Sequence, residues 1–270
     1  TPALSSAASD VYKRQSLPPD WKVIEARSYP VCEQDIEFFC STAYIGMLET
    51  IKIAFAATVF GFIGAILLSS LAARNLSPTW LSILVRIVLS AMRSLPSLIW
   101  AILFVIVVGF GPLAGVLAMT FYTIGYLGKL QYEAIEGMES APLEASRATG
   151  LSHPEIFTNV VIPQTGNHLL SQMMFMFEYN VRHGSVIGIV GAGGIGYFIN
   201  NYLKLLMYSR VFALLIIIFV VVVIIDLLSM AIRSFVNDQG DVRRPSWFTV
   251  LLPAKNAVEI HHGSVAEEES

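Results

Sequence analysis

Long apolar segments separated by short polar ones dominate this chain of 270 residues. Residues 53–128 carry only three formal charges, all arginines, and residues 211–232 carry only Asp226. A helix needs about 20 apolar residues in succession to cross the hydrocarbon core of a bilayer. The pattern therefore predicts an all-α membrane protein.

About five transmembrane helices follow from the pattern, at residues 51–73, 81–108, 113–130, 164–190 and 211–232. The second segment is long for one straight helix and has Pro96 near its middle. Because proline lacks an amide hydrogen and clashes with the preceding turn, we expect a kink or break near 95–97. Polar side chains interrupt the fourth segment.

The regions outside these segments are polar. We expect 1–15 to be a disordered or artefactual stretch, 16–50 an extracytoplasmic polar segment, 51–235 the transmembrane domain, and 236–270 a cytoplasmic tail. The stretch 1–15 has no apolar core and is therefore not a signal peptide. Cys32 and Cys40 precede the first span; they either pair or stay free thiols, and their spacing matches no metal site.

The distribution of arginines predicts the orientation. Arg74, Arg86 and Arg93 follow the first span, and Arg233 follows the last. Because short cytoplasmic loops are enriched in Lys and Arg, these residues and the loop 131–163 are expected in the cytoplasm. The N-terminal region would then start outside, so we expect that one helix is missing upstream.

Composition excludes several classes of protein. Only 14% of the residues are charged and 55% are hydrophobic, against about 25% and about 45–50% in soluble domains. These values exclude a disordered chain, a small disulfide-stapled domain and most soluble enzymes. The net charge of −3 does not favour nucleic-acid binding.

The loop 131–163 is polar and predicts two short helices with a sharp bend. Ser140 is a candidate cap for a helix over 141–149, and Gly150 stands where a left-handed residue ends such a helix. Ser152 and Glu155 form a capping box that begins the second helix. We expect a compact helix–turn–helix.

This loop carries a specific motif. Glu144, Ala145 and Ser146 are followed after three residues by Gly150, and after nine more by Val160, Ile162 and Pro163. The pattern resembles the E-A-A–x3–G–x9–I-x-L-P signature of ABC importer permeases; Ser146 departs from the second alanine. The alternative is a capped polar loop without a partner.

The resemblance implies a type I (MetI-like) importer permease fold and several partners. The loop would contact a cytoplasmic ABC ATPase dimer, which supplies ATP and Mg. A permease homodimer in the lipid bilayer of the bacterial cytoplasmic membrane would receive its solute from an extracytoplasmic substrate-binding protein.

A glycine-rich stretch near 191–196 formally matches the dinucleotide fingerprint G-x-G-x-x-G through Gly191, Gly193, Gly194 and Gly196. Its flanks are membrane spans rather than a βαβ unit, so that interpretation fails. We expect a flexible turn with close backbone approach.

Together with 177–182, the stretch resembles permeases of the phosphonate ABC importer family. The resemblance implies transport of phosphonate or a related phosphorus oxyanion; the alternative is another small solute, such as methionine.

Three polar residues inside the fourth span, Glu178, Asn180 and Arg182, are costly in lipid and should face protein or a wet cavity. Glu178 and Arg182 are four residues apart and can form a structural ion pair. Alternatively, Arg182 and Asn180 line the substrate pathway and donate to the anion. Asp226 is expected to be a helix-packing partner.

The other function classes lack sequence support. The chain has no H-E-x-x-H and no G-x-S-x-G motif, so we predict no catalytic residue and no metal site. We also expect no directly bound cofactor. A transport subunit without catalysis of its own remains the prediction.

Overall fold

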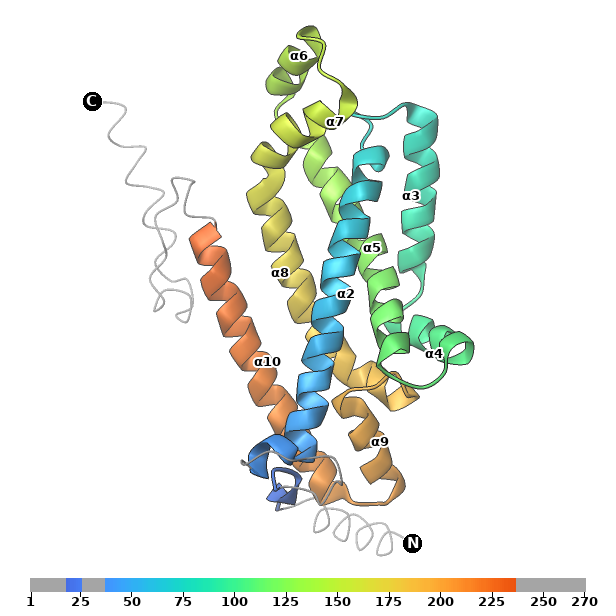
Figure 1. Cartoon of the computed structure of the whole chain (residues 1–270), viewed down its shortest axis with the longest axis vertical. Helices are drawn as coiled ribbons and strands as arrows, with labels where there is room; N and C mark the ends of the chain where they lie inside the picture. The colour runs from blue at the N-terminus through green and yellow to red at the C-terminus, as the bar shows by residue number, and fades with distance from the viewer. Residues whose placement is uncertain (1–17, 26–36, 237–270) are drawn as a thin grey trace, which may run out of the picture. The chain divides into compact units, whose positions relative to one another are not determined.

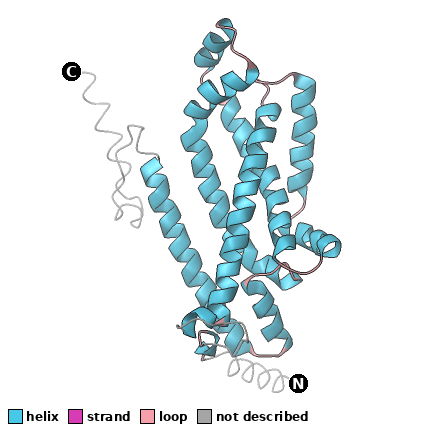
Figure 2. Ribbon diagram, in the orientation of Figure 1, coloured by secondary structure: helices cyan, strands magenta, loops and turns pink. Residues whose placement is uncertain are grey.

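The computed structural model describes residues 18–25 and 37–236, and this part of the chain contains helices and no strand (Figure 2). The predicted stretch 1–15 and, apart from Val236, the predicted tail 236–270 lie outside the described residues. Cys32 also lies outside them, and Cys40 is disulfide-bonded. The prediction of an all-α membrane protein is confirmed.

The elements run in a simple order (Figure 1). They are η1 (Trp21–Val23), η2 (Glu37–Cys40), α2 (Thr42–Ala72), α3 (Thr79–Ser94), α4 (Ser97–Val108), α5 (Pro112–Glu136), α6 (Ser140–Ala148), α7 (His153–Ile156), η3 (Phe157–Val161), α8 (Ile162–Ile187), η4 (Gly188–Val190), α9 (Ile195–Lys204) and α10 (Tyr208–Val236).

Four helical segments among the described residues are long and apolar enough to cross a membrane, and the bent pair α3–α4 makes a fifth candidate span. The pair bends by 88°. The break lies at Leu95 and Pro96, as predicted. Leu95 takes an extended conformation because a following proline disfavours the helical region for the residue before it.

Small residues allow the central helices to approach closely. On α2, Ala54, Ala57 and Ala65 are fully buried. A Cβ on Gly61 would lie 2.3 Å from the Thr123 side chain of α5, so only glycine fits this crossing. This packing is typical of membrane helices, which gain contact area through small residues. In α10, by contrast, only 17% of the most apolar stretch is buried.

Some helices differ from those expected from the sequence. Helix α2 begins at Thr42, so the end of the region predicted as polar, 16–50, is helical. Ser41 caps it and accepts a hydrogen bond from the Tyr44 amide at 3.2 Å. The connection before the last span contains α9, which the hydrophobic pattern did not predict because the helix is only ten residues long.

Candidate functional site

Helices α6 and α7 form a hairpin at the opposite end of the bundle from α9 (Figure 1). Gly150 follows α6 with φ +77°, the left-handed conformation predicted from the sequence. Its amide donates to the Arg147 carbonyl at 3.0 Å, and the Leu151 amide donates to the Ser146 carbonyl at 3.3 Å. These two bonds form a Schellman motif, which ends a helix and reverses the chain.

The second helix of the hairpin starts from the predicted capping box. The Ser152 amide donates to Glu155 Oε2 at 2.7 Å. The expected cap at Ser140 was wrong by one residue: Glu139 precedes α6 and makes no side-chain cap bond. Ser140 is instead the first helical residue.

A π-helical turn, η3, joins α7 to α8. The Ile162 amide donates to the Phe157 carbonyl, five residues earlier. Pro163 follows directly and has no amide to donate, and wide turns of this kind relieve the clash that a proline causes. The backbone therefore runs helically from the hairpin into a membrane span.

The underside of the hairpin is fixed to the bundle. Leu143 and Ile156 pack into an apolar cluster with residues of α5, η3 and the turn after α2. Arg147 donates through Nη2 to the Asn75 carbonyl, and His153 Nε2 lies 2.6 Å from the Leu76 carbonyl. The hairpin is thus held to the α2–α3 connection by apolar and polar contacts.

The motif residues divide into exposed and buried positions. Glu144, Ala145 and Gly150 are exposed, whereas Ser146 is buried and donates to the Leu143 carbonyl at 2.7 Å. Beyond the hairpin, Val160 and Ile162 are half-buried and Pro163 is exposed. The free surface of α6 therefore presents an acidic and a small side chain outward.

A network of four charges links α8 to α10. Arg182 donates through Nη2 to Glu178 of its own helix and to Asp226 Oδ2 at 2.9 Å. Arg233 donates to Glu178 Oε2 at 2.7 Å. The predicted ion pair between Glu178 and Arg182 is therefore present and extends across two helices. The sequence analysis did not predict that Arg233 joins this network. The available signal was its spacing, because Asp226 and Arg233 are seven residues apart and therefore share one helix face.

Asn180 does not join this network. Its side chain is 1% exposed and donates through Nδ2 to Thr58 Oγ1 at 2.9 Å and to Thr123 Oγ1 at 3.1 Å. Asn180 thus ties α8 to α2 and α5. The structure brings Glu178 and Arg182 together and leaves Asn180 on the opposite side of the helix.

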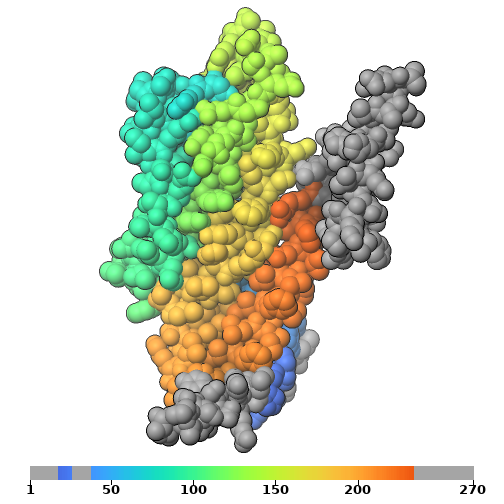
Figure 3. Space-filling view, turned by 180° about the vertical axis from the view of Figure 1, so that it is seen from behind, coloured from blue at the N-terminus to red at the C-terminus, as the bar shows by residue number. Residues whose placement is uncertain are grey.

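Polar side chains near both ends of α8 share its exposed side, here called the α8 stripe. Gln164, Asn167 and His168 are exposed near the start of the helix and Arg182 near its end, and the exposed Phe175 lies on the same side between them. The surface of α8 is visible between those of α5 and α10 on one face of the bundle (Figure 3). Polar side chains within a span face protein or water rather than lipid. We therefore take the α8 stripe as the candidate pathway surface.

The glycine-rich turn is tightly packed. Gly191, Gly193 and Gly194 have φ values of +92°, +83° and +74°. Gly196, which was predicted to lie in the turn, belongs instead to α9. A Cβ there would lie 2.2 Å from the Ser185 carbonyl, so the backbones of α8 and α9 touch at this point.

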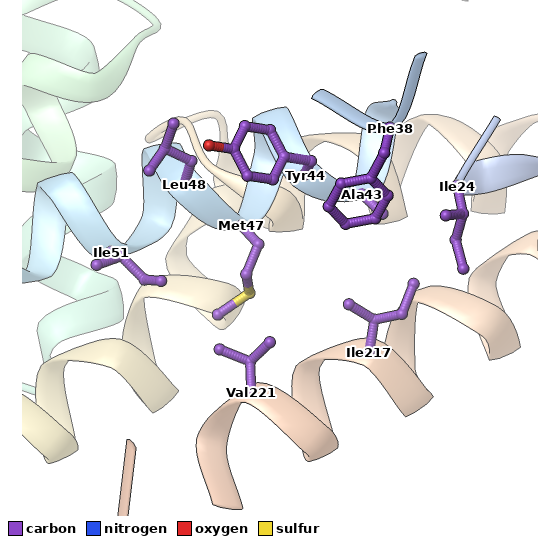
Figure 4. A pocket seen from close by; sticks show the side chains of 9 residues that line it. All are labelled: Ile24, Phe38, Ala43, Tyr44, Met47, Leu48, Ile51, Ile217 and Val221. Carbon is purple, nitrogen blue, oxygen red and sulfur yellow. The ribbon is translucent and has the colours of Figure 1, made fainter. Parts of the chain in front are cut away.

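An apolar pocket of about 320 Å³ opens between η2, α2 and α10 (Figure 4). Its lining comprises Ile24, Phe38, Ala43, Tyr44, Met47, Leu48, Ile51, Ile217 and Val221. The Tyr44 hydroxyl is the one side-chain polar group of this lining, so the pocket does not suit an anion. The described residues contain no group of three or more His, Cys, Asp or Glu that could hold a metal.

The fold is that of a type I importer permease. It is similar to the methionine ABC transporter MetNI in an inward-facing conformation, with a TM-score of 0.64 at 23% identity over 73% of this chain and 96% of that chain. Residues 65–237 match the family of binding-protein-dependent transport system inner membrane components.

Two relatives are similar to this chain over most of its length. The phosphite transport system permease protein PtxC of Stutzerimonas stutzeri is 37% identical over 70% of this chain and 69% of that protein. The phosphate-import permease protein PhnE of Mycolicibacterium smegmatis is 37% identical over 73% of this chain and 37% of that protein. The chain belongs to the family of binding-protein-dependent transport system inner membrane components. It is an ABC importer permease subunit, integral to the inner membrane.

Proposed function

We propose that this permease carries a phosphorus oxyanion, namely phosphonate, phosphite or phosphate, across the cytoplasmic membrane. The similarity to phosphite and phosphate permeases supports this class of solute. The methionine transporter matches at 23% identity, a level that supports the fold and not the substrate. An amino acid is therefore the less favoured solute.

The observation that carries the transport mechanism is the α6–α7 hairpin with its exposed Glu144. The hairpin is stiff, because a Schellman turn and a capping box fix both of its helices. It continues helically through η3 into α8. A cytoplasmic ATPase dimer, closing on ATP and Mg, would push on this hairpin and move α8.

The pathway would run along the α8 stripe. We infer that a second copy of the permease faces this stripe, because its exposed polar groups are unsuited to lipid. Arg182 would donate to the anion as it passes. An extracytoplasmic substrate-binding protein would deliver the solute at the α9 end, and lipid would cover the apolar surface of α10.

The coupling role is tested by co-purification with the partner ATPase and by the rate of ATP hydrolysis of the complex in proteoliposomes. Glu144→Ala should reduce the stimulation of ATPase activity by the loaded binding protein, because α6 loses its exposed carboxylate. Glu133→Ala is the matched control, since Glu133 is an exposed glutamate of α5 outside the hairpin. Absence of a co-purifying ATPase, or equal stimulation in both variants, would contradict the proposal.

A further inference from the structure

Two arginines from different helices meet on one carboxylate. Glu178 Oε2 accepts a hydrogen bond from Arg233 Nη2 at 2.7 Å, and Oε1 accepts one from Arg182 Nη2. The Glu178 side chain is 12% exposed, whereas those of Arg182 and Arg233 are 44% and 28% exposed. Two accessible cations thus converge on an almost enclosed anion.

This arrangement has the chemistry of an oxyanion site. Guanidinium groups bind carboxylates and phosphoryl groups through the same planar pattern of donors. Arg182 and Arg233 supply two positive charges, and Glu178 and Asp226 supply two negative charges. A singly charged oxyanion that replaces the Glu178 carboxylate would leave the net charge of the network at zero.

Two atoms of the network are buried without a hydrogen-bond partner among the described residues: Asp226 Oδ1, an acceptor, and Arg233 Nε, a donor. Buried polar atoms of this kind are costly when they stay unmatched. A singly charged phosphorus oxyanion offers at least one hydroxyl donor and several acceptor oxygens. Its hydrogen-bonding groups are therefore of the kinds that the network leaves unmatched.

We propose that Arg182 and Arg233 form a binding site for a phosphorus oxyanion, and that Glu178 occupies this site as an internal counter-ion until the substrate displaces it. The inference rests on the proposed function and adds Arg233 to the residues that bind the anion. Displacement would break the Arg233–Glu178 contact between α8 and α10. Substrate binding would thereby exchange this direct contact for a link between α8 and α10 through the bound anion.

A purely structural role for the network predicts a different response to substitution. If the four charges only held α8 and α10 together, removal of an acid or of an arginine would have no specific effect on anion binding. If Glu178 competes with the substrate, its removal strengthens anion binding while removal of an arginine weakens it. The two kinds of substitution therefore have effects of opposite sign.

The test is equilibrium binding of radiolabelled inorganic phosphate to the purified importer complex without its binding protein. Glu178→Gln should tighten binding at least about threefold, and Arg233→Gln should weaken it at least about tenfold. Glu133→Gln is the control, because Glu133 forms an ion pair with Lys129 four residues away, outside the network. It should bind phosphate as the wild type does.

Unchanged or weaker binding by Glu178→Gln would overturn the proposal, as would wild-type binding by Arg233→Gln. Absence of binding at millimolar phosphate in both the wild type and Glu178→Gln would also overturn it. If the Glu178→Gln variant does not assemble, Asp226→Asn replaces it, because Asp226 also forms an ion pair with Arg182. The Asp226→Asn variant should likewise bind phosphate more tightly than the wild type. Unchanged binding by this variant would contradict the proposed site. The assay involves no ATP hydrolysis, so its failure would leave the coupling role of the hairpin standing.

Discussion

Substitution of Gly150 separates backbone strain from steric crowding at the hairpin. The residue has φ +77°, and a Cβ built on it would meet no atom within 4 Å. Alanine therefore adds no clash, and its entire cost comes from the left-handed conformation. Asparagine tolerates this conformation better than alanine, because its side chain can bond locally to the backbone.

The cost of the left-handed conformation is about 1–2 kcal/mol for an ordinary residue. Because about 1.4 kcal/mol corresponds to a tenfold change in an equilibrium constant, Gly150→Ala should shift the hairpin toward an open turn by roughly fivefold to thirtyfold. The open turn loses the bond from the Leu151 amide to the Ser146 carbonyl. The bundle, which lies beneath the hairpin, should keep its stability.

The assay is ATP-driven uptake by the reconstituted importer, measured beside thermal unfolding of the permease. We expect uptake to be highest in the wild type, lower in Gly150→Asn and lower again in Gly150→Ala, with little change in the unfolding temperature. A β-branched Gly150→Val should be the most impaired. Equal uptake by Gly150→Val and the wild type would refute the reasoning, because the turn would then not need the left-handed residue.

Three further predictions concern stability. Gly196→Ala should destabilise the protein by about 1–3 kcal/mol in a denaturant titration, because its Cβ would lie 2.2 Å from the Ser185 carbonyl; unchanged stability would contradict the close contact. Asn180→Leu should cost about 1–3 kcal/mol, because it removes the hydrogen bonds of a buried amide to α2 and α5, and a neutral effect in the same titration would count against that role. The hydrogen bond from Arg210 lowers the pKa of Asp20, so this contact stabilises the protein above the ordinary pKa of aspartate and is lost as the pH falls through the lower folded value. Thermal unfolding between about pH 2 and pH 6 should show a smaller pH dependence in Asp20→Asn, and identical profiles would refute the link.

Local signals in the sequence predicted the features that depend on neighbouring residues. Pro96 predicted the break between α3 and α4, since a missing amide acts on its own turn. Gly150 and the Ser152–Glu155 pair predicted the bend of the hairpin for the same reason. Such signals need no knowledge of the tertiary structure.

Features that depend on contacts between distant residues were not predictable in this way. The pairing of Arg233 with Glu178 joins residues 55 positions apart, and only the packing of α10 on α8 brings them together. Asn180 was grouped with Arg182 by sequence proximity, but its helical position turns it toward Thr58 and Thr123. The side of a helix that a polar residue occupies is set by its neighbouring helices.

The central claim is tested most directly by uptake into proteoliposomes that contain this permease with its ATPase and binding protein. Labelled phosphite, phosphate or methylphosphonate should accumulate only when ATP is present, and the Glu144→Ala variant should accumulate less. ATP-driven accumulation of methionine without uptake of any phosphorus oxyanion would contradict the account.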